Sequence, residues 1–142
     1  MEVRVLVDTN VLLDYLLNRE PFSEHARKII LSCKEKKIQG CIAAHSISNM
    51  FFILRKEFSV EERKAILTDL CLLFTVEGID RFKLLSALKN QDFKDFEDCL
   101  QMECAKSFQA DYIITRNIDD FKNCQIACMT PEKFCILLEI QK

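Results

Sequence analysis

Carboxylate and amide side chains occur in three stretches of this sequence that lie far apart along the chain. Asp8 follows the apolar run "VRVLV", Asp95 and Asp98 lie in "DFKDFEDCLQ", and Asn117 and Asp120 lie in "TRNIDDF". Asp95 and Asp98 are three residues apart, so on a helix they share one face with Cβ atoms about 5–6 Å apart. If the three stretches meet, their oxygen atoms suit a hard cation, Mg²⁺ or Mn²⁺.

Such an ion can activate a water molecule and stabilise negative charge on a phosphodiester. Several carboxylates held close together repel one another and call for a compensating cation. The chemistry implied is therefore metal-dependent hydrolysis of a phosphodiester, with water rather than a side chain as the nucleophile.

The elements that must position these residues alternate between strand and helix. We expect a buried strand over Val3–Val7 and a helix over Thr9–Leu17, followed by short strands in "IQGCIAA", "FTVEGI", "DYIIT" and "QIACMT" with helices between them. Pro21 suits the first turn of a helix over 22–36, and a further helix is expected over 46–57. The pattern predicts one α/β domain over 1–142, with three α/β/α layers and a central, mainly parallel five-stranded sheet.

Ligands in such folds bind beyond the carboxyl ends of the strands. Asp8 and "TRNIDDF" directly follow strands, and a helix that opens near Asp95 and feeds a parallel strand begins near the same edge. The acids therefore can converge. Each also has a simpler interpretation: Asp8 or Asp95 could cap a helix, and Asp120 could be solvated. Asp14 is expected to be a surface or capping residue.

Composition limits the class of protein. The chain has 142 residues, 49% of them hydrophobic and 30% charged, and a net charge of −2, which gives no general attraction to nucleic acid or to an acidic membrane. No apolar run is long enough to span a bilayer, and the first residues lack the features of a secretion signal. Eight cysteines without a C-x-x-C motif are expected to be reduced and mostly buried. We therefore expect a cytoplasmic protein without a membrane partner.

The stretches "VLVDTNVLLDYLL", "DFEDCLQ" and "DYIITRNIDDF", in this order, resemble the successive signatures of PIN domains. The resemblance covers essentially the whole chain. It implies an endoribonuclease that depends on Mg²⁺ or Mn²⁺ and has an RNA substrate. Small bacterial PIN domains of the VapC-like type are often the toxins of toxin–antitoxin pairs, so an antitoxin protein and a homodimer are the partners implied. The exposed faces expected for such contacts are "FFILRKEF" and the helix before the third strand.

The resemblance also assigns roles to individual residues. Asp8 would be the first metal ligand and Asp98 the acid on the later helix, with Asp95 assisting, while Asn117 or Asp120 would complete the site. Hydrogen bonds from three further residues, Thr9, Asn10 and Thr115, would orient these groups. Arg116 could contact phosphate, although ordinary surface solvation explains it equally well.

One position departs from the family pattern. Most active PIN domains have a glutamate on the helix after the second strand, and "SISNMFFIL" has Asn49 there. Many members also have aspartate where this chain has Asn117. Loss of an anion weakens the binding of a hard cation. A catalytically weakened PIN fold that binds RNA or protein is therefore the alternative. A phosphatase of the haloacid dehalogenase type would need a second acid where Asn10 stands.

Overall fold

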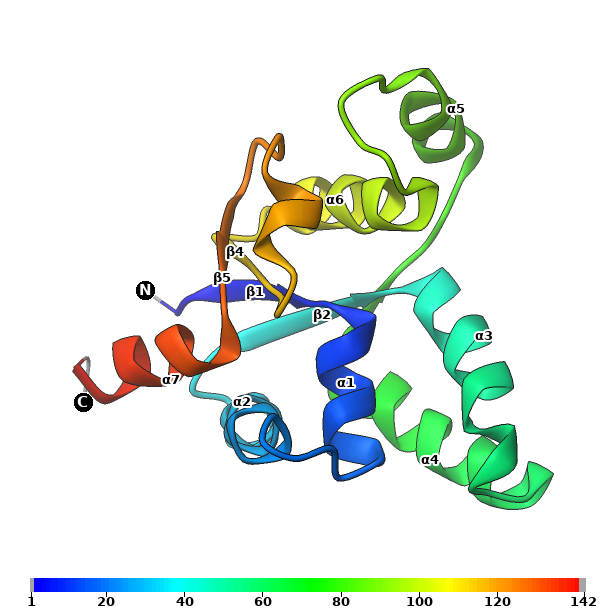
Figure 1. Cartoon of the computed structure of the whole chain (residues 1–142), viewed down its shortest axis with the longest axis vertical. Helices are drawn as coiled ribbons and strands as arrows, with labels where there is room; N and C mark the ends of the chain where they lie inside the picture. The colour runs from blue at the N-terminus through cyan, green and yellow to red at the C-terminus, as the bar shows by residue number, and fades with distance from the viewer. Residues whose placement is uncertain (1, 141–142) are drawn as a thin grey trace.

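A five-stranded parallel sheet forms the centre of the molecule. The structure, a computed structural model, describes residues 2–140 (Figure 1). The strands are β1 (Arg4–Val7), β2 (Gln39–Ala43), β3 (Thr75–Glu77), β4 (Tyr112–Ile114) and β5 (Ala127–Met129), in the order β3-β2-β1-β4-β5. Every adjacent pair of strands is parallel. All five carboxyl ends therefore point to one edge, as the sequence predicts.

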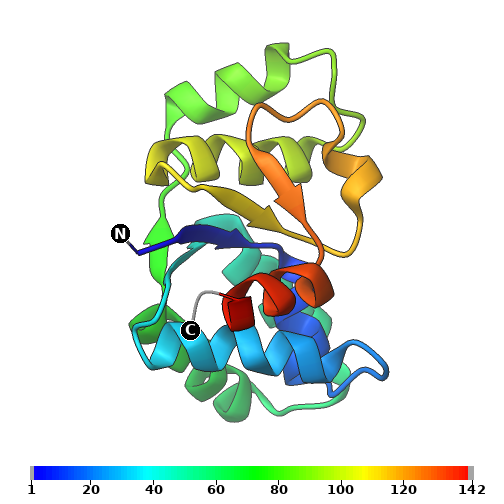
Figure 2. The same ribbon diagram turned by 90° about the vertical axis from the view of Figure 1, so that its left-hand side faces the viewer.

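Helices cover both faces of this sheet (Figures 1 and 2). One face is covered by α6 (Phe96–Phe108), with α5 (Arg81–Lys89) outside it; the other carries α1 (Thr9–Leu16), α2 (Ser23–Lys34), α3 (Ala44–Ile53), α4 (Val60–Leu73) and α7 (Pro131–Ile140). Two 3₁₀ turns, η1 (Leu54–Lys56) and η2 (Ile118–Phe121), follow α3 and β4. This arrangement confirms the predicted three-layer α/β/α fold.

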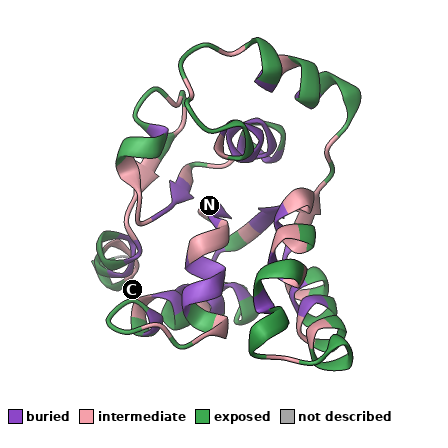
Figure 3. Cartoon of the chain, turned by 45° about the vertical axis from the view of Figure 1, so that its right-hand side comes forward, coloured by how far each residue is buried: buried purple, intermediate pink, exposed green. Residues whose placement is uncertain are grey.

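The alternation of side chains along each strand divides the core into two parts. In β1, Val5 and Val7 pack in the core shared with α1, α2 and α7, whereas Leu6 packs against α6. In β2, Ile42 joins the first core and Cys41 the second. Figure 3 shows the buried residues along the strands and on the inward sides of α1 and α6. β1 is the central strand of the sheet and both of its faces are buried, so Asp8 directly follows a strand that is packed on all sides.

The helix boundaries differ slightly from those expected. The helix expected over 46–57 begins two residues earlier, at Ala44, directly after β2, and its last turn is the 3₁₀ turn η1. The helix expected over 22–36 begins at Ser23, with Pro21 in the turn before it. Differences of one or two residues at helix ends are normal. The early start of α3 brings its first two turns to the edge where β2 ends.

Two expectations from composition concern the whole chain. All eight cysteines are free thiols, and five of them are buried, which agrees with their expected use as core residues. Within residues 2–140, no helix has both the length and the apolar character needed to cross a bilayer.

Candidate active site

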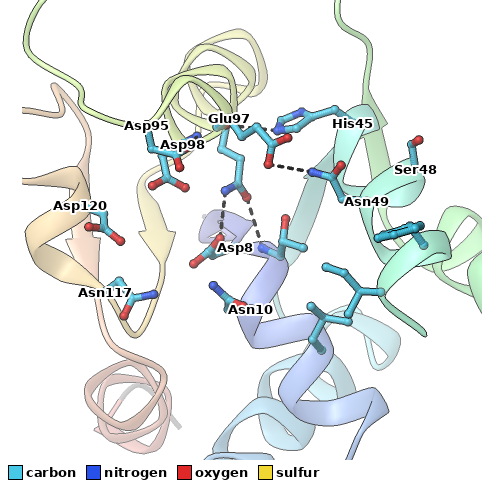
Figure 4. Close-up of a pocket in the computed structure, with 15 residues that line it drawn as sticks. Asp8, Asn10, His45, Ser48, Asn49, Asp95, Glu97, Asp98, Asn117 and Asp120 are labelled. Atoms are coloured by element: carbon cyan, nitrogen blue, oxygen red, sulfur yellow. Dashed lines mark hydrogen bonds between the residues drawn. The ribbon is translucent and has the colours of Figure 1, made fainter. Parts of the chain in front are cut away.

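A groove of about 540 Å³ opens where β1, β2 and β4 end (Figure 4). It collects side chains from α1, α3, α6 and the segment after β4. The sequence-predicted residues that line it are Asp8, Thr9, Asn10, Asn49, Asp95, Asp98, Asn117 and Asp120, and Glu97, Gln101 and His45 line it too. The structure thus brings together residues separated by more than a hundred positions, whereas Thr115 lies beneath the groove and Arg116 beside it.

Asp8 lies at the base of this groove and is 3% exposed. It occupies the N-cap position of α1, yet its carboxylate makes no capping hydrogen bond. Instead, Oδ1 accepts a hydrogen bond from Nε2 of Gln101 at 2.9 Å, and Oδ2 accepts one from the Thr115 hydroxyl at 2.8 Å. Burial raises the pKa of Asp8, and these two hydrogen bonds oppose the increase. The structure therefore does not support the helix-cap interpretation of this side chain.

Gln101 is a site residue that the sequence analysis missed. It is 2% exposed and lies on α6, three residues after Asp98, on the same helix face. Besides donating to Asp8, it accepts a hydrogen bond from the backbone N–H of Thr9 at 3.3 Å. One amide thus ties α6 to the first turn of α1. The spacing from Asp98 was the available signal, but a glutamine in an amphipathic helix carries no chemistry by itself.

Two threonines hold the floor of the site in place. The Thr115 hydroxyl donates to Asp8 and accepts from the backbone N–H of Asn117 at 3.0 Å. The Thr9 hydroxyl lies 2.6 Å from the hydroxyl of Ser46 on α3. These hydrogen bonds link the ends of β1 and β4 to α3. Thr115 makes the expected kind of contact with a carboxylate, whereas the Thr9 hydroxyl contacts Ser46 and none of the acids.

The acids of α6 face Asp8 across the groove (Figure 4). Asp95 caps α6, because its Oδ1 accepts from the backbone N–H of Asp98 at 3.0 Å, and its side chain also lines the groove. Burial, followed by repulsion from Asp95, Asp8, Asp120 and Glu97, raises the pKa of Asp98 to about 7. The capping interpretation of Asp95 is thus correct but incomplete. The groove carries more negative charge than its own residues balance.

Asp14 and Arg116 form an ion pair beside the groove. Arg116 donates from Nε to Oδ2 of Asp14 at 2.6 Å and from Nη2 to Oδ1 at 3.1 Å, and it stacks 4.0 Å above the Phe22 ring. Arg19 adds a longer contact to Asp14 at 3.6 Å. Asp14 is fully buried, so the expectation of a surface or capping residue is wrong. The pair fixes the segment after β4 to α1 and turns Arg116 away from the groove.

At the opposite wall, Asn49 of α3 contacts Glu97 of α6. The amide Nδ2 of Asn49 donates to Oε2 of Glu97 at 3.0 Å, and Nε2 of His45 lies 3.1 Å from the backbone carbonyl oxygen of Glu97. Burial is the main cause that lowers the pKa of His45. Glu97 was not among the predicted site residues, since in sequence it is only one more acid in the first turn of a helix.

Comparison with known proteins identifies the fold family. A family model described as the PIN domain matches residues 4–119. The chain belongs to the PIN domain family. A comparison with curated protein sequences found no match.

Solved structures show the same PIN fold at low sequence identity. A toxin–antitoxin complex from Klebsiella pneumoniae has a chain with a TM-score of 0.68 and 20% identity, and the match covers 89% of this chain and 97% of that one. VapBC2 from Rickettsia felis, bound to a promoter DNA fragment, matches with a TM-score of 0.64 and 14% identity. The match covers 90% of this chain and 98% of that one. FitAcB from Neisseria gonorrhoeae matches with a TM-score of 0.63 and 17% identity, and the match again covers 90% of this chain and 98% of that one.

The donors lining this groove of the PIN domain suit an oxygen-preferring divalent cation. Five carboxylates line it, from Asp8, Asp95, Glu97, Asp98 and Asp120. Among residues 2–140, no three His, Cys, Asp or Glu side chains already converge on one point as a complete metal site. Binding of an ion would therefore require the more exposed carboxylates to turn toward Asp8, whose own position is fixed.

Proposed function

We propose that this PIN domain is an endoribonuclease that uses Mg²⁺ or Mn²⁺ to hydrolyse RNA. The observation that carries the proposal is the concentration of five carboxylates in one groove, with Asp8 buried at its base. None of the described residues that line the groove is lysine or arginine. A phosphodiester is itself an anion, so its approach to this groove needs cations that the residues lining it do not supply.

The proposed ligands are Asp8 and Asp98, with Asp95 and Asp120 completing the set. A bound divalent cation would activate water and stabilise the negative charge that develops on the phosphate. Gln101 and Thr115 would keep the Asp8 carboxylate at one position and orientation, since each holds one of its oxygens.

Two amides extend this proposed arrangement toward the substrate. Asn10 and Asn117 both line the groove and lie below Asp8 in the view of Figure 4. Each amide can donate to a phosphate oxygen and accept from water. We propose that they orient the substrate and the attacking water without adding negative charge.

The test is cleavage of single-stranded RNA pools by the purified protein in Mg²⁺ and in Mn²⁺. The wild type should cleave, and Asp8→Asn and Asp98→Asn should each lose at least about a hundredfold in rate, because each removes a charged ligand. Asp69→Asn, an exposed acid on α4, is the matched control and should cleave normally. A wild type that stays inert with both metals on varied RNAs would refute the proposal.

We further propose that the protein is the toxin of a toxin–antitoxin pair, acts in the cytoplasm and forms a homodimer. The fold shared with the Klebsiella pneumoniae toxin–antitoxin complex supports the first part. An apolar groove between α3 and α4, lined by Ile47, Phe51, Leu67 and Leu72, supplies surface for a protein partner.

Induced expression should arrest growth for the wild type and not for Asp8→Asn. Size-exclusion chromatography with light scattering should give a dimer mass, and a monomer mass would refute that part.

The second candidate function is a binding module without catalysis, favoured by the amide at position 49. Thermal unfolding in increasing Mn²⁺ separates the two functions. A ligand that binds the native state raises the unfolding midpoint. An enzyme with a working metal site should show this increase, and Asp8→Asn should remove it. A midpoint that Mn²⁺ leaves unchanged would favour the module.

A further inference from the structure

Glu97 reaches the place where the family's usual acid is missing. It is the second residue of α6, and its carboxylate extends to the side chain of Asn49 on α3 (Figure 4). The 3.0 Å hydrogen bond between Asn49 Nδ2 and Glu97 Oε2 places a carboxylate oxygen next to the tip of side chain 49. Both residues line the groove that holds Asp8 and Asp98. A carboxylate thus stands at this wall, supplied by α6 instead of α3.

The identities of the two residues are chemically linked. A glutamate at position 49 would put a second carboxylate within hydrogen-bonding distance of Glu97, and two like charges at that separation repel. An asparagine at the same position donates a hydrogen bond to Glu97 instead. Unless a cation lies between them, two carboxylates at this wall repel, whereas the amide of Asn49 donates a hydrogen bond to the one that is present.

The backbone of residue 97 is held in the same place by a second contact. The ring of His45, four residues before Asn49, lies 3.1 Å from the Glu97 carbonyl oxygen through Nε2. Both contacts join the second residue of α6 to the first two turns of α3. The Glu97 backbone is thus held against α3 by His45, and its exposed carboxylate lies beside the Asn49 amide, from which binding of an ion would turn it toward Asp8.

A purely structural role would account for part of this geometry. A carboxylate in the first turn of a helix interacts favourably with the helix dipole, and a cross-helix hydrogen bond stabilises packing. Glu61 provides the comparison, because it is also an exposed glutamate at the second position of a helix, α4. It lies outside the groove. Whatever the helix dipole alone contributes should be common to both residues.

We propose that Glu97 replaces the acid absent at position 49 and supplies, from α6, a carboxylate that binds the divalent cation. This inference rests on the proposed function and specifies which residues complete its metal site. It explains how a PIN domain with Asn49 can retain the negative charge that its groove needs.

The experiment measures Mn²⁺ binding to the full chain, by electron paramagnetic resonance of the free ion, so that no RNA cleavage is involved. Glu97→Gln should weaken Mn²⁺ binding by about tenfold or more, because a charged ligand is lost. Glu61→Gln should change it less than twofold. The double variant Asn49→Glu/Glu97→Gln, which moves the charge back to α3, should recover to within about threefold of the wild type. Circular dichroism in EDTA checks that each variant is folded.

The results separate this inference from the function on which it depends. If the wild type binds Mn²⁺ and Asp8→Asn does not, but Glu97→Gln binds as well as Glu61→Gln, the role of Glu97 is refuted and the metal site stands. A double variant that binds no better than Glu97→Gln refutes the replacement as well. If the wild type itself binds no more Mn²⁺ than Asp8→Asn, the proposed function and the inference both fail.

Discussion

Asp98→Asn should make the metal-free protein more stable at pH 8, although it removes a proposed metal ligand. Burial and four neighbouring carboxylates raise the pKa of Asp98 to about 7 in the folded protein. An aspartate in an unfolded chain has a pKa of about 3.9. At pH values between these two pKa values, Asp98 is protonated in the folded state and ionised in the unfolded state. The contribution to stability is complete below about pH 4 and is lost as the pH rises through about 7.

The size of the effect follows from the pKa difference. Each pKa unit corresponds to about 1.36 kcal/mol, so without screening the charged form would cost the folded state about 4 kcal/mol. Asp98 is only half-buried, and water and salt reduce this cost to about 1–2 kcal/mol. Because the substitution also removes a negative charge from the first turn of α6, the variant loses up to about 1 kcal/mol of favourable interaction with the helix dipole. A net gain of about 1 kcal/mol remains, which corresponds to about 3 °C in unfolding temperature.

Thermal unfolding by circular dichroism, in EDTA, tests this prediction at pH 8 and at pH 5. At pH 8 the variant should unfold about 3 °C above the wild type. At pH 5 Asp98 is protonated in the folded wild type but ionised in the unfolded chain, so about a third of the difference remains and the variant should unfold only about 1 °C above the wild type. Asp69→Asn is the control for removing an exposed acid and should shift the midpoint by less than about 1 °C at either pH. An Asp98→Asn midpoint at or below that of the wild type at pH 8 would refute the reasoning.

Three further predictions concern contacts that hold the site and the fold. Asp14→Asn should lower the free energy of unfolding in urea by about 2–4 kcal/mol, because Arg116 loses its buried carboxylate partner, and a loss below about 1 kcal/mol would contradict a structural role for the pair. Gln101→Leu should cost about 1–3 kcal/mol at neutral pH by the same measurement, because the Asp8 carboxylate stays buried and loses a donor; unchanged stability would show that water replaces the amide. Ser59→Ala should cost about 1 kcal/mol by removing the capping box of α4, whereas an unchanged midpoint would show that the cap is dispensable.

The positions of Asp8 and of Asn117 in the fold could be predicted because Asp8 directly follows β1 and Asn117 lies three residues after the end of β4. Local sequence determines where an apolar run of β-branched residues ends, and the parallel order of strands then places both residues at one edge. The capping box at Ser59 follows from a different local rule, because it depends only on two residues three positions apart.

The contacts that define the rest of the site join residues too distant for such rules. Gln101 and Asp8 are 93 positions apart, and Arg116 and Asp14 are 102 apart. Nothing in the sequence around Asp14 distinguishes a buried ion-pair residue from a solvated one. Glu97 was overlooked because acids in the first turn of a helix are favoured by the helix dipole whether or not they carry a function.

The most direct test of the central claim is a time course of single-stranded RNA cleavage in Mn²⁺, with analysis of the product ends. Attack by water leaves products without a 2′,3′-cyclic phosphate, and replacing the 2′-hydroxyl at the cleavage site by hydrogen should not stop the reaction. We predict such cleavage by the wild type and its loss in Asp8→Asn. An inert wild type, equal cleavage by Asp8→Asn, or products that end in a cyclic phosphate would contradict the claim that this acidic groove hydrolyses RNA with metal-activated water.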